Sequence, residues 1–146
     1  MSALARLAEL GIELPPVPAP AGSYVPAVRS GNLVYTAGQV AREWTGKVGA
    51  EVSEQDAKAA ARSCALNALA AVDALVGLDS VVRVVKVVGF VASAPGFTGQ
   101  PGVINGASEL LGEVFGPAGT HARSAVGVAE LPLGVAVEVE LIVEVR

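Results

Sequence analysis

The sequence has very few of the residues that build disulfides and metal centres. Cys64 is its only cysteine and His121 its only histidine among 146 residues. One cysteine cannot form an intrachain disulfide or a thiolate cluster, and one histidine cannot supply a His-rich metal site within one chain. We therefore expect no metal, and the scarcity of cysteine is typical of a cytosolic protein.

Charged residues are also scarce. They make up 16% of the chain, while hydrophobic residues make up 52%; a typical soluble domain has about 25% charged residues. A single domain of this length has a large surface for its volume and normally needs charge to cover it. The shortage predicts a homo-oligomer, in which copies of the chain cover part of one another's surface.

A basic cluster and a long apolar run are missing as well. The ten lysines and arginines are scattered and the formal net charge is −4, whereas nucleic-acid binding requires a clustered basic surface. The longest uncharged stretch, residues 87–108, is interrupted by Pro95 and Pro101, and Arg6 and Glu9 lie where a signal peptide has its apolar core. We expect a cytoplasmic protein that binds neither nucleic acid nor membrane.

The chain is expected to form one domain, residues 1–146, that begins with a Pro-rich arm over about residues 1–23. The proline run between Leu14 and Pro20 favours extended chain over a helix or strand throughout this arm. After it, residues 24–29 and 32–36 are typical of two strands joined by a tight turn.

Two helices are expected after these strands. Residues 53–76 keep their apolar side chains, many of them alanine, at the 3–4 spacing of one buried face. Ser53 and Asp56 resemble a capping box at its start, and Gly77 is a typical end. Residues 101–115 have the same spacing and predict the second helix.

Three further strands complete the fold. The valine-rich residues 81–92 favour a strand covered on both faces. Residues 121–129 predict another strand, and residues 135–146 alternate valine or leucine with glutamate. Residues 130–134 are expected to join these last two strands as a hairpin. The order is β-β-α-β-α-β-β, an α+β fold with two helices on one face of a mixed sheet.

Arg123 is the side chain with the least ordinary position, because it lies among small residues in a predicted strand. A guanidinium keeps its charge, so a buried arginine needs a carboxylate partner or a bound anion. It could hold a substrate carboxylate through two parallel hydrogen bonds. The alternative is a surface arginine on an edge strand. His121 shares its strand face and could move a proton, although a lone histidine is more often structural.

Five short motifs stand in order along the chain. They are Gly22-x-Tyr24-x-Pro26, Gly31-Asn32-Leu33-Val34-Tyr35-Thr36-Ala37-Gly38-Gln39, Ala122-Arg123-Ser124-Ala125-Val126, Glu130-Leu131-Pro132 and Val137-Glu138-Val139-Glu140. Together they resemble the RidA/YjgF/L-PSP family over about residues 20–146. The segments Leu10-Gly11-Ile12-x-Leu14-Pro15-Pro16 and Gly89-Phe90-Val91-Ala92-Ser93-Ala94-Pro95-Gly96-Phe97 resemble a longer subgroup labelled endoribonuclease L-PSP, chorismate mutase-like.

The resemblance implies a chorismate-mutase-like fold, a homotrimer, and sites in clefts between subunits. It implies hydrolysis of reactive 2-imino or enamine acids to 2-keto acids and ammonia, without a cofactor. By position, Arg123 would hold the substrate carboxylate and Tyr24 would line the cleft. Gly38 matches the glycine of the strand-end turn, Asn105 the asparagine on the second helix, and Glu138 the glutamate near the attacking water.

The sequence departs from the family pattern at two of the expected substrate-binding positions. Ala37 stands where deaminating members have serine, and Ala125 stands where cysteine is common. In the family the backbone carbonyl at the second position meets the substrate nitrogen, so alanine can serve there. Ala37 and Ala125 together favour an alternative, a trimeric protein that binds small carboxylate metabolites without turning them over.

Two further alternatives fit the residues less well. An endoribonuclease or translation inhibitor is disfavoured by the acidic charge and by the lack of paired acid/base histidines. A chorismate mutase would need several cations around a dicarboxylate, and only Arg123 stands out. The role of Glu138 depends on the register of the expected hairpin. Symmetric closure puts Glu138 and Arg123 on opposite faces, whereas a bulge near residues 132–134 would put them on one face. Glu138 would otherwise serve a neighbouring subunit's cleft or be a solvated surface charge.

Overall fold

The structure is a computed structural model that describes residues 1–17 and 19–146. Pro18, part of the predicted Pro-rich arm, lies outside these residues. Within them, six strands form one sheet: β1 (Ala27–Ser30), β2 (Leu33–Thr36), β3 (Gln39–Val40), β4 (Val81–Ala92), β5 (Ala122–Val128) and β6 (Val137–Val145).

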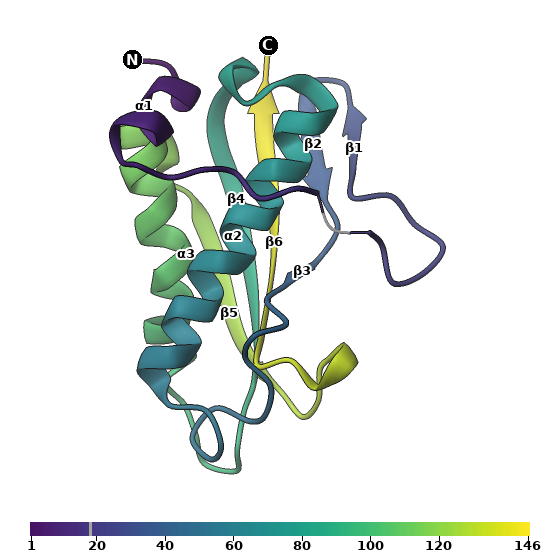
Figure 1. Cartoon of the computed structure of the whole chain (residues 1–146), viewed down its shortest axis with the longest axis vertical. Helices are drawn as coiled ribbons and strands as arrows, with labels where there is room; N and C mark the ends of the chain where they lie inside the picture. The colour runs from purple at the N-terminus through teal and green to yellow at the C-terminus, as the bar shows by residue number, and fades with distance from the viewer. Residues whose placement is uncertain (18) are drawn as a thin grey trace.

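The sheet is mixed and two long helices cover one of its faces. Its strand order is β1-β2-β6-β4-β5, and β3 extends the sheet by pairing with β6. Only β4 and β5 run parallel among the described strands. Figure 1 shows α2 (Glu54–Val76) and α3 (Gln100–Phe115) side by side in front of the sheet. The predicted α+β class, with two helices on one face of a mixed sheet, is confirmed.

The predicted hairpin of the last two strands is wrong. β5 pairs with β4, and β4 pairs with β6, so β4 separates the two strands that the sequence suggested were neighbours. The crossover through α3 returns the chain parallel to β4, as a helical connection between strands requires. Residues 130–134 therefore pass across the end of β4. They contain a tight turn in which Leu133 has a φ of 64° and Gly134 a φ of 68°.

The N-terminal arm begins with a helix, which corrects the prediction of an extended segment. The Ser2 hydroxyl caps α1 (Ala3–Glu9) by accepting a hydrogen bond from the Ala5 N–H, at 3.2 Å. The prolines begin only at Pro15, after this helix, and Figure 1 shows the arm then crossing α2. Local helix formers in residues 3–9 thus prevail over the prolines that follow them.

Both ends of the chain are held by the same residue. The Leu4 N–H donates to the Asp79 carboxylate at 2.9 Å, and the Arg146 guanidinium donates to the Asp79 backbone carbonyl. Asp79 lies in the short 3-10 turn between α2 and β4. The Arg6 side chain also donates to the Glu113 carbonyl in the last turn of α3, at 2.9 Å. These bonds hold α1 against the turn that follows α2 and against the last turn of α3.

Small residues set the spacing between the sheet and the two long helices. The Ser53 hydroxyl caps α2 by accepting from the Asp56 N–H, at 3.1 Å, and the buried face of α2 is mostly alanine. Cys64 lies in this face, and burial raises the pKa of its thiol, with the charge of Glu138 as the second cause. By length and composition alone α2 is apolar enough to cross a membrane, and its buried face here packs on the sheet and on α3.

The two helices approach each other tightly at Gly106 of α3. A Cβ added there would collide with the Lys58 carbonyl oxygen of α2, which is backbone and cannot rotate away. By contrast, a Cβ added at Gly112, on the same helix, would have nothing within 4 Å.

This difference yields a matched pair of variants. We expect Gly106→Ala to lower the free energy of unfolding by about 1–3 kcal/mol, because the added methyl forces the helices apart. Gly112→Ala should raise it by about 0.5–1 kcal/mol through helix propensity alone. Urea denaturation of both variants measures these changes, and equal effects at the two glycines would show that the helix contact is not tight.

Candidate functional site

The predicted site residues form two separate groups in one chain. Tyr24, Ala37, Gly38 and Glu138 line one pocket, whereas Arg123 contacts Asn105 beneath α3 and Ala125 lies two residues further along β5.

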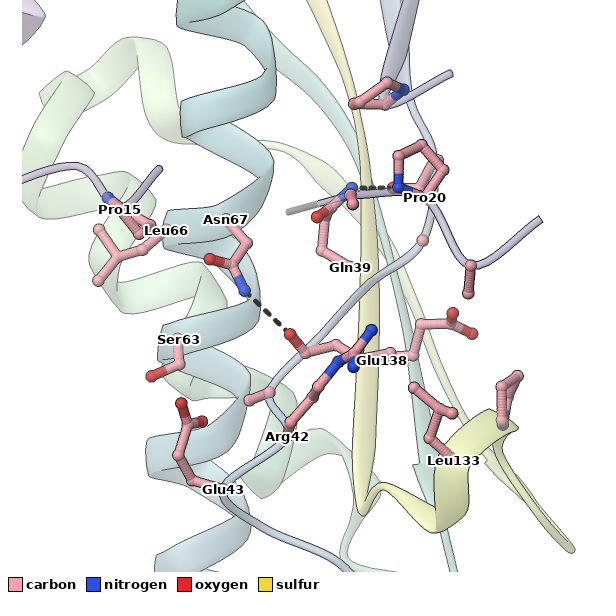
Figure 2. Close-up of a pocket in the computed structure, with 18 of the residues that line it drawn as sticks. Pro15, Pro20, Gln39, Arg42, Glu43, Ser63, Leu66, Asn67, Leu133 and Glu138 are labelled. Atoms are coloured by element: carbon pink, nitrogen blue, oxygen red, sulfur yellow. Dashed lines mark hydrogen bonds between the residues drawn. The ribbon is translucent and has the colours of Figure 1, made fainter. Parts of the chain in front are cut away.

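The pocket has a volume of about 840 Å³. Its walls come from the N-terminal arm, the β2–β3 corner, α2 and the turn at residues 132–134. Figure 2 shows the β3 segment running through it: Arg42 and Glu138 lie on one side of this segment, and Glu43 points to the opposite side, toward Ser63 of α2. A hydrogen bond from the Asn67 amide to the Val40 carbonyl, 2.9 Å long, ties β3 to α2.

The corner between β2 and β3 is a bulge against β6. Both short strands pair with β6, but the register slips by one residue between them. At the slip the Thr36 hydroxyl accepts a hydrogen bond from the Leu141 N–H, at 3.0 Å, in place of a backbone carbonyl. Gly38 therefore lies at a bulge, a position where glycine is common in strands.

Gly38 makes room for the Glu138 side chain. A Cβ added at Gly38 would lie 2.6 Å from a Glu138 carboxylate oxygen. The carboxylate therefore lies over bare backbone, partly buried. Burial raises the pKa of Glu138, and the charge of Glu140 on the same strand face raises it further. A carboxyl group held in this way accepts and returns a proton more readily near neutral pH than an ordinary glutamate does.

Tyr24 is fixed by a local turn and remains accessible. Its phenolic oxygen accepts a hydrogen bond from the Ala21 N–H at 3.0 Å, and the side chain is 49% exposed. The Ala37 N–H donates to the Pro26 carbonyl at 2.8 Å, which holds the Tyr24 segment next to the β2–β3 corner. The ring thus forms an exposed apolar wall of the pocket.

Arg42 and Leu133 are among the residues that line this pocket and that sequence reasoning missed. Arg42 follows the short strand β3, which was too brief to be predicted. Leu133 is 57% exposed and has the only positive φ of any non-glycine among residues 1–17 and 19–146. The preceding Pro132 and following Gly134 are turn signals, but nothing in the sequence indicates that a leucine takes the left-handed position.

The second group is centred on Arg123, on the edge strand β5. Its Nη1 donates to the Asn105 side-chain oxygen at 2.8 Å and to the Ser108 hydroxyl at 3.2 Å. Its Nη2 donates to the Pro101 carbonyl at 3.3 Å. All three acceptors belong to α3, so the helix fixes the guanidinium plane. Among the described residues no carboxylate forms an ion pair with this guanidinium.

Three of the five guanidinium N–H groups of Arg123 are engaged in this way. The Nε–H and one Nη2–H have no acceptor in the described part of the chain. These nitrogens are adjacent, and two parallel N–H groups match the two oxygens of a carboxylate. The arrangement therefore presents a rigid cation with the donors needed to hold one carboxylate.

The two groups lie on opposite faces of the sheet. Arg123 is level with Val87 and Leu141, both buried beneath the helices. Glu138 pairs with Phe90 and therefore belongs to the alternate, uncovered face. The predicted β5–β6 hairpin, whose register would decide the faces of Arg123 and Glu138, does not exist, because β4 lies between β5 and β6. Within one chain, Glu138 and Arg123 do not form a common site.

In residues 1–17 and 19–146, no three side chains of His, Cys, Asp or Glu lie close enough together to hold a metal ion. The histidine instead forms hydrogen bonds at both ring nitrogens, to the Ser108 hydroxyl and the Gly119 carbonyl.

Comparison with known proteins identifies the family of this fold. The endoribonuclease L-PSP family model matches residues 16–145. The chain belongs to this family. Protein TCP17 of Trypanosoma cruzi is 48% identical over 149 residues, which cover 97% of this chain and 93% of TCP17. The crystal structure of Atu1372 from Agrobacterium tumefaciens, a protein described as having unknown function, is 46% identical, covers 99% and 92% of the two chains, and has a TM-score of 0.90.

More distant members of the family have the same fold. The structure of the E. coli YjgF gene product is 32% identical, covers 89% of this chain and 94% of its own, and has a TM-score of 0.65. The structure of E. coli TdcF with bound serine is 28% identical, covers 89% and 93% of the two chains, and has a TM-score of 0.63. The resemblance to the RidA/YjgF/L-PSP family and the fold that it implied are thus confirmed.

The raised pKa of Glu138 predicts how stability depends on pH. Because the folded state holds the Glu138 proton more tightly than the unfolded state, the stabilisation is complete below the ordinary value of 4.5 and is lost as the pH rises through the raised value. We expect Glu138→Gln to lack this loss. The melting temperature of the variant, relative to that of the wild type, should therefore increase as the pH rises from 4.5.

Glu144→Gln is the matched control, since it removes a charge from the same strand face. The difference between the two variants isolates the effect of burial at Glu138. A constant offset between Glu138→Gln and the wild type across this pH range would contradict the assignment.

Proposed function

We propose that the chain forms a homotrimeric hydrolase that converts reactive 2-imino or enamine acids to 2-keto acids and ammonia. The observation that carries this proposal is the Arg123 guanidinium, which α3 fixes with two adjacent N–H groups left for a carboxylate. A small acid with one carboxylate next to its reacting carbon suits this single cation.

Assembly is part of the proposal because each chain holds only half of the chemistry. Arg123 and Asn105 form a carboxylate-binding half, and Tyr24, Gly38 and Glu138 form a proton-transfer half on the other face. When two different surfaces of one chain complement each other, copies join head to tail, and the rotation closes a ring. Three copies would then create three equivalent clefts.

The uncovered face of the sheet supports this assembly. Val28, Tyr35 and Val126 lie on strands β1, β2 and β5 and are 50%, 40% and 44% exposed. By strand pairing they share the face of Glu138, opposite the helices. Exposed apolar residues spread over one sheet face are typical of a surface that another subunit covers. The low charge content of the chain agrees with this.

The chemistry required of the site is modest. The C=N carbon of a 2-imino acid is already electrophilic, so the protein must hold the carboxylate, direct a water molecule and move protons. Arg123 holds the carboxylate. Glu138 of the adjoining copy takes a proton from water as the water oxygen bonds to the imine carbon, and passes that proton to the nitrogen as the C=N double bond becomes single. Glu138 then takes the proton of the new hydroxyl group as the C=O forms and passes it to the nitrogen, so that the carbon–nitrogen bond breaks and ammonia leaves. Positioning of this kind contributes at most roughly 7–11 kcal/mol to barrier lowering.

A specific observation favours a second candidate, binding without turnover. Ala37 gives the pocket corner no hydroxyl beside Gly38, so a nucleophilic water there would lack one hydrogen-bond partner. Serine bound to TdcF shows that a related protein binds an amino acid, a ligand of the same chemical class. In this case the same clefts would sequester a small carboxylate metabolite.

The assembly has a direct test. We expect light scattering at micromolar concentration to give the mass of a trimer, and Val126→Glu to shift it to monomer, because a charge would be buried in the interface. Leu75→Glu is the matched control: Leu75 is 45% exposed but lies on α2, so this variant should remain trimeric. A wild-type monomer would contradict both the assembly and the site between subunits.

The carboxylate anchor has a second test. Arg123→Ala should weaken 2-oxobutyrate binding, measured by calorimetry, by about 2–5 kcal/mol, the usual cost of removing one partner of a charged pair. Arg62→Ala, which removes an exposed arginine paired with Glu113 on the outer side of α2 and α3, should leave binding unchanged. Unchanged affinity in Arg123→Ala would exclude Arg123 as the anchor.

The same proteins separate the two candidate functions. Freshly generated 2-iminobutyrate is mixed with each, and release of ammonia and 2-oxobutyrate is followed. Wild-type turnover that is lost in both Arg123→Ala and Glu138→Gln supports the hydrolase. Wild-type binding of 2-oxobutyrate without turnover supports the binding protein.

A further inference from the structure

We propose that Ser108 and His121 are positioning residues that hold Arg123 in its carboxylate-binding orientation. This rests on the proposed function, because it assigns how the anchor of that site is held. The Ser108 hydroxyl lies between the other two side chains, 3.2 Å from Arg123 Nη1 and 2.9 Å from His121 Nε2. The remaining ring nitrogen, Nδ1, is 2.6 Å from the Gly119 carbonyl oxygen.

Elementary hydrogen-bond chemistry fixes which group donates and which accepts in each of these hydrogen bonds. The Gly119 carbonyl can only accept, so His121 Nδ1 carries a hydrogen and donates it. The Nε2 of the neutral ring is then an acceptor, and the Ser108 hydroxyl donates to it. With its own hydrogen committed to His121, the Ser108 oxygen presents lone pairs to the Arg123 Nη1–H. With the ring neutral, each group in this series of hydrogen bonds has one compatible role.

This series of hydrogen bonds ends at the backbone of Gly119, which is held in place by tight packing. Gly119 closes the short 3-10 turn Gly116–Gly119 and is buried. A Cβ added there would collide with the Leu111 carbonyl oxygen of α3, so Gly119 packs directly on the helix that also carries Ser108. His121 therefore links Ser108 to a fixed point.

The arrangement explains why Ser108 contributes more than a contact. Asn105, the other partner of Arg123 Nη1, is an exposed side chain, and its amide can rotate. The Ser108 hydroxyl is held in one orientation by His121 and therefore fixes which way the Nη1 hydrogens point. The Nε–H and Nη2–H that would meet a carboxylate are fixed with them, because the guanidinium is planar. Ligand binding then requires less ordering of the arginine.

The test is a double-mutant cycle on the full-length protein. Ser108→Ala should raise the Kd for 2-oxobutyrate about tenfold, as expected for one lost hydrogen bond to a charged group. Where turnover of 2-iminobutyrate is measured, its Michaelis constant should rise by the same factor. The kcat should change little, because neither residue touches the reacting carbon. Ser108→Thr keeps the hydroxyl and should restore most of the affinity.

His121 should act only through Ser108. His121→Ala should raise the Kd several-fold in the wild-type background and have almost no effect in the Ser108→Ala background. His121→Gln, whose side-chain oxygen can accept from Ser108, should be milder than His121→Ala. Additive losses, or a fall in kcat with an unchanged Michaelis constant, would overturn the positioning role.

Controls separate this inference from the proposed function. Alanine is the better helix former, so Ser108→Ala should not lower the melting temperature, and an affinity loss then reports positioning rather than unfolding. If Arg123→Ala itself leaves 2-oxobutyrate binding unchanged, the proposed function fails. If Arg123→Ala loses binding while Ser108→Ala retains wild-type affinity, only the positioning role is wrong.

Discussion

The parallel pairing of β5 with β4 is the constraint on which the arrangement of the site depends. A parallel neighbour requires a crossover connection, and α3 supplies it, so α3 must lie over the strand that follows it. Arg123 is thereby placed beneath α3, whose Pro101, Asn105 and Ser108 accept its hydrogen bonds. The same pairing moves β5 to the sheet edge, away from β6 and its glutamates. The position of Arg123 and its separation from Glu138 thus both follow from the pairing of β5 with β4.

The division into two half-sites makes the oligomer a chemical requirement in our proposal. An arginine with spare N–H groups attracts carboxylates, and a Glu138 in the same chain and on the same face would compete with the substrate. Placing Glu138 on the opposite face avoids that internal ion pair. A shared cleft between copies would bring the two charges near each other only around a ligand that uses both.

Local sequence patterns predicted the long helices and strands well, but they failed where pairing between segments far apart in the sequence decides the strand order. The alternation of residues 135–146 and the spacing of residues 53–76 report which side chains face a core, so β6 and α2 were predicted close to their observed bounds. The loop at residues 130–134 has hairpin composition, but whether its flanking strands are neighbours depends on β4, which lies much earlier in the chain. That choice is set by burial of the whole sheet and has no local signal.

Site residues followed the same division. Arg123 stands out because a charge lies among small residues in a predicted strand, whereas Gly38 and Glu138 were assigned through the resemblance to the family. Ser108 does not stand out, because one serine on a partly exposed helix face looks ordinary until the crossover places His121 and Arg123 beside it. α1 was not predicted because the prolines that follow it favour extended chain, although its own seven residues readily form a helix.

The bonds from Asp79 to both ends of the chain have a consequence for how the molecule opens. Leu4 near one terminus and Arg146 at the other both bind Asp79, so hydrogen bonds to this one residue bring the two termini together. Chain ends ordinarily fray independently and at little cost. Here either end that peels away leaves Asp79 still bound to the other, which keeps the departing end's partner in place for it to rebind. Substitution of Asp79 would remove only the bond to Leu4, since the Arg146 guanidinium donates to the Asp79 backbone carbonyl and the Arg146 N–H also donates to the Ser80 carbonyl.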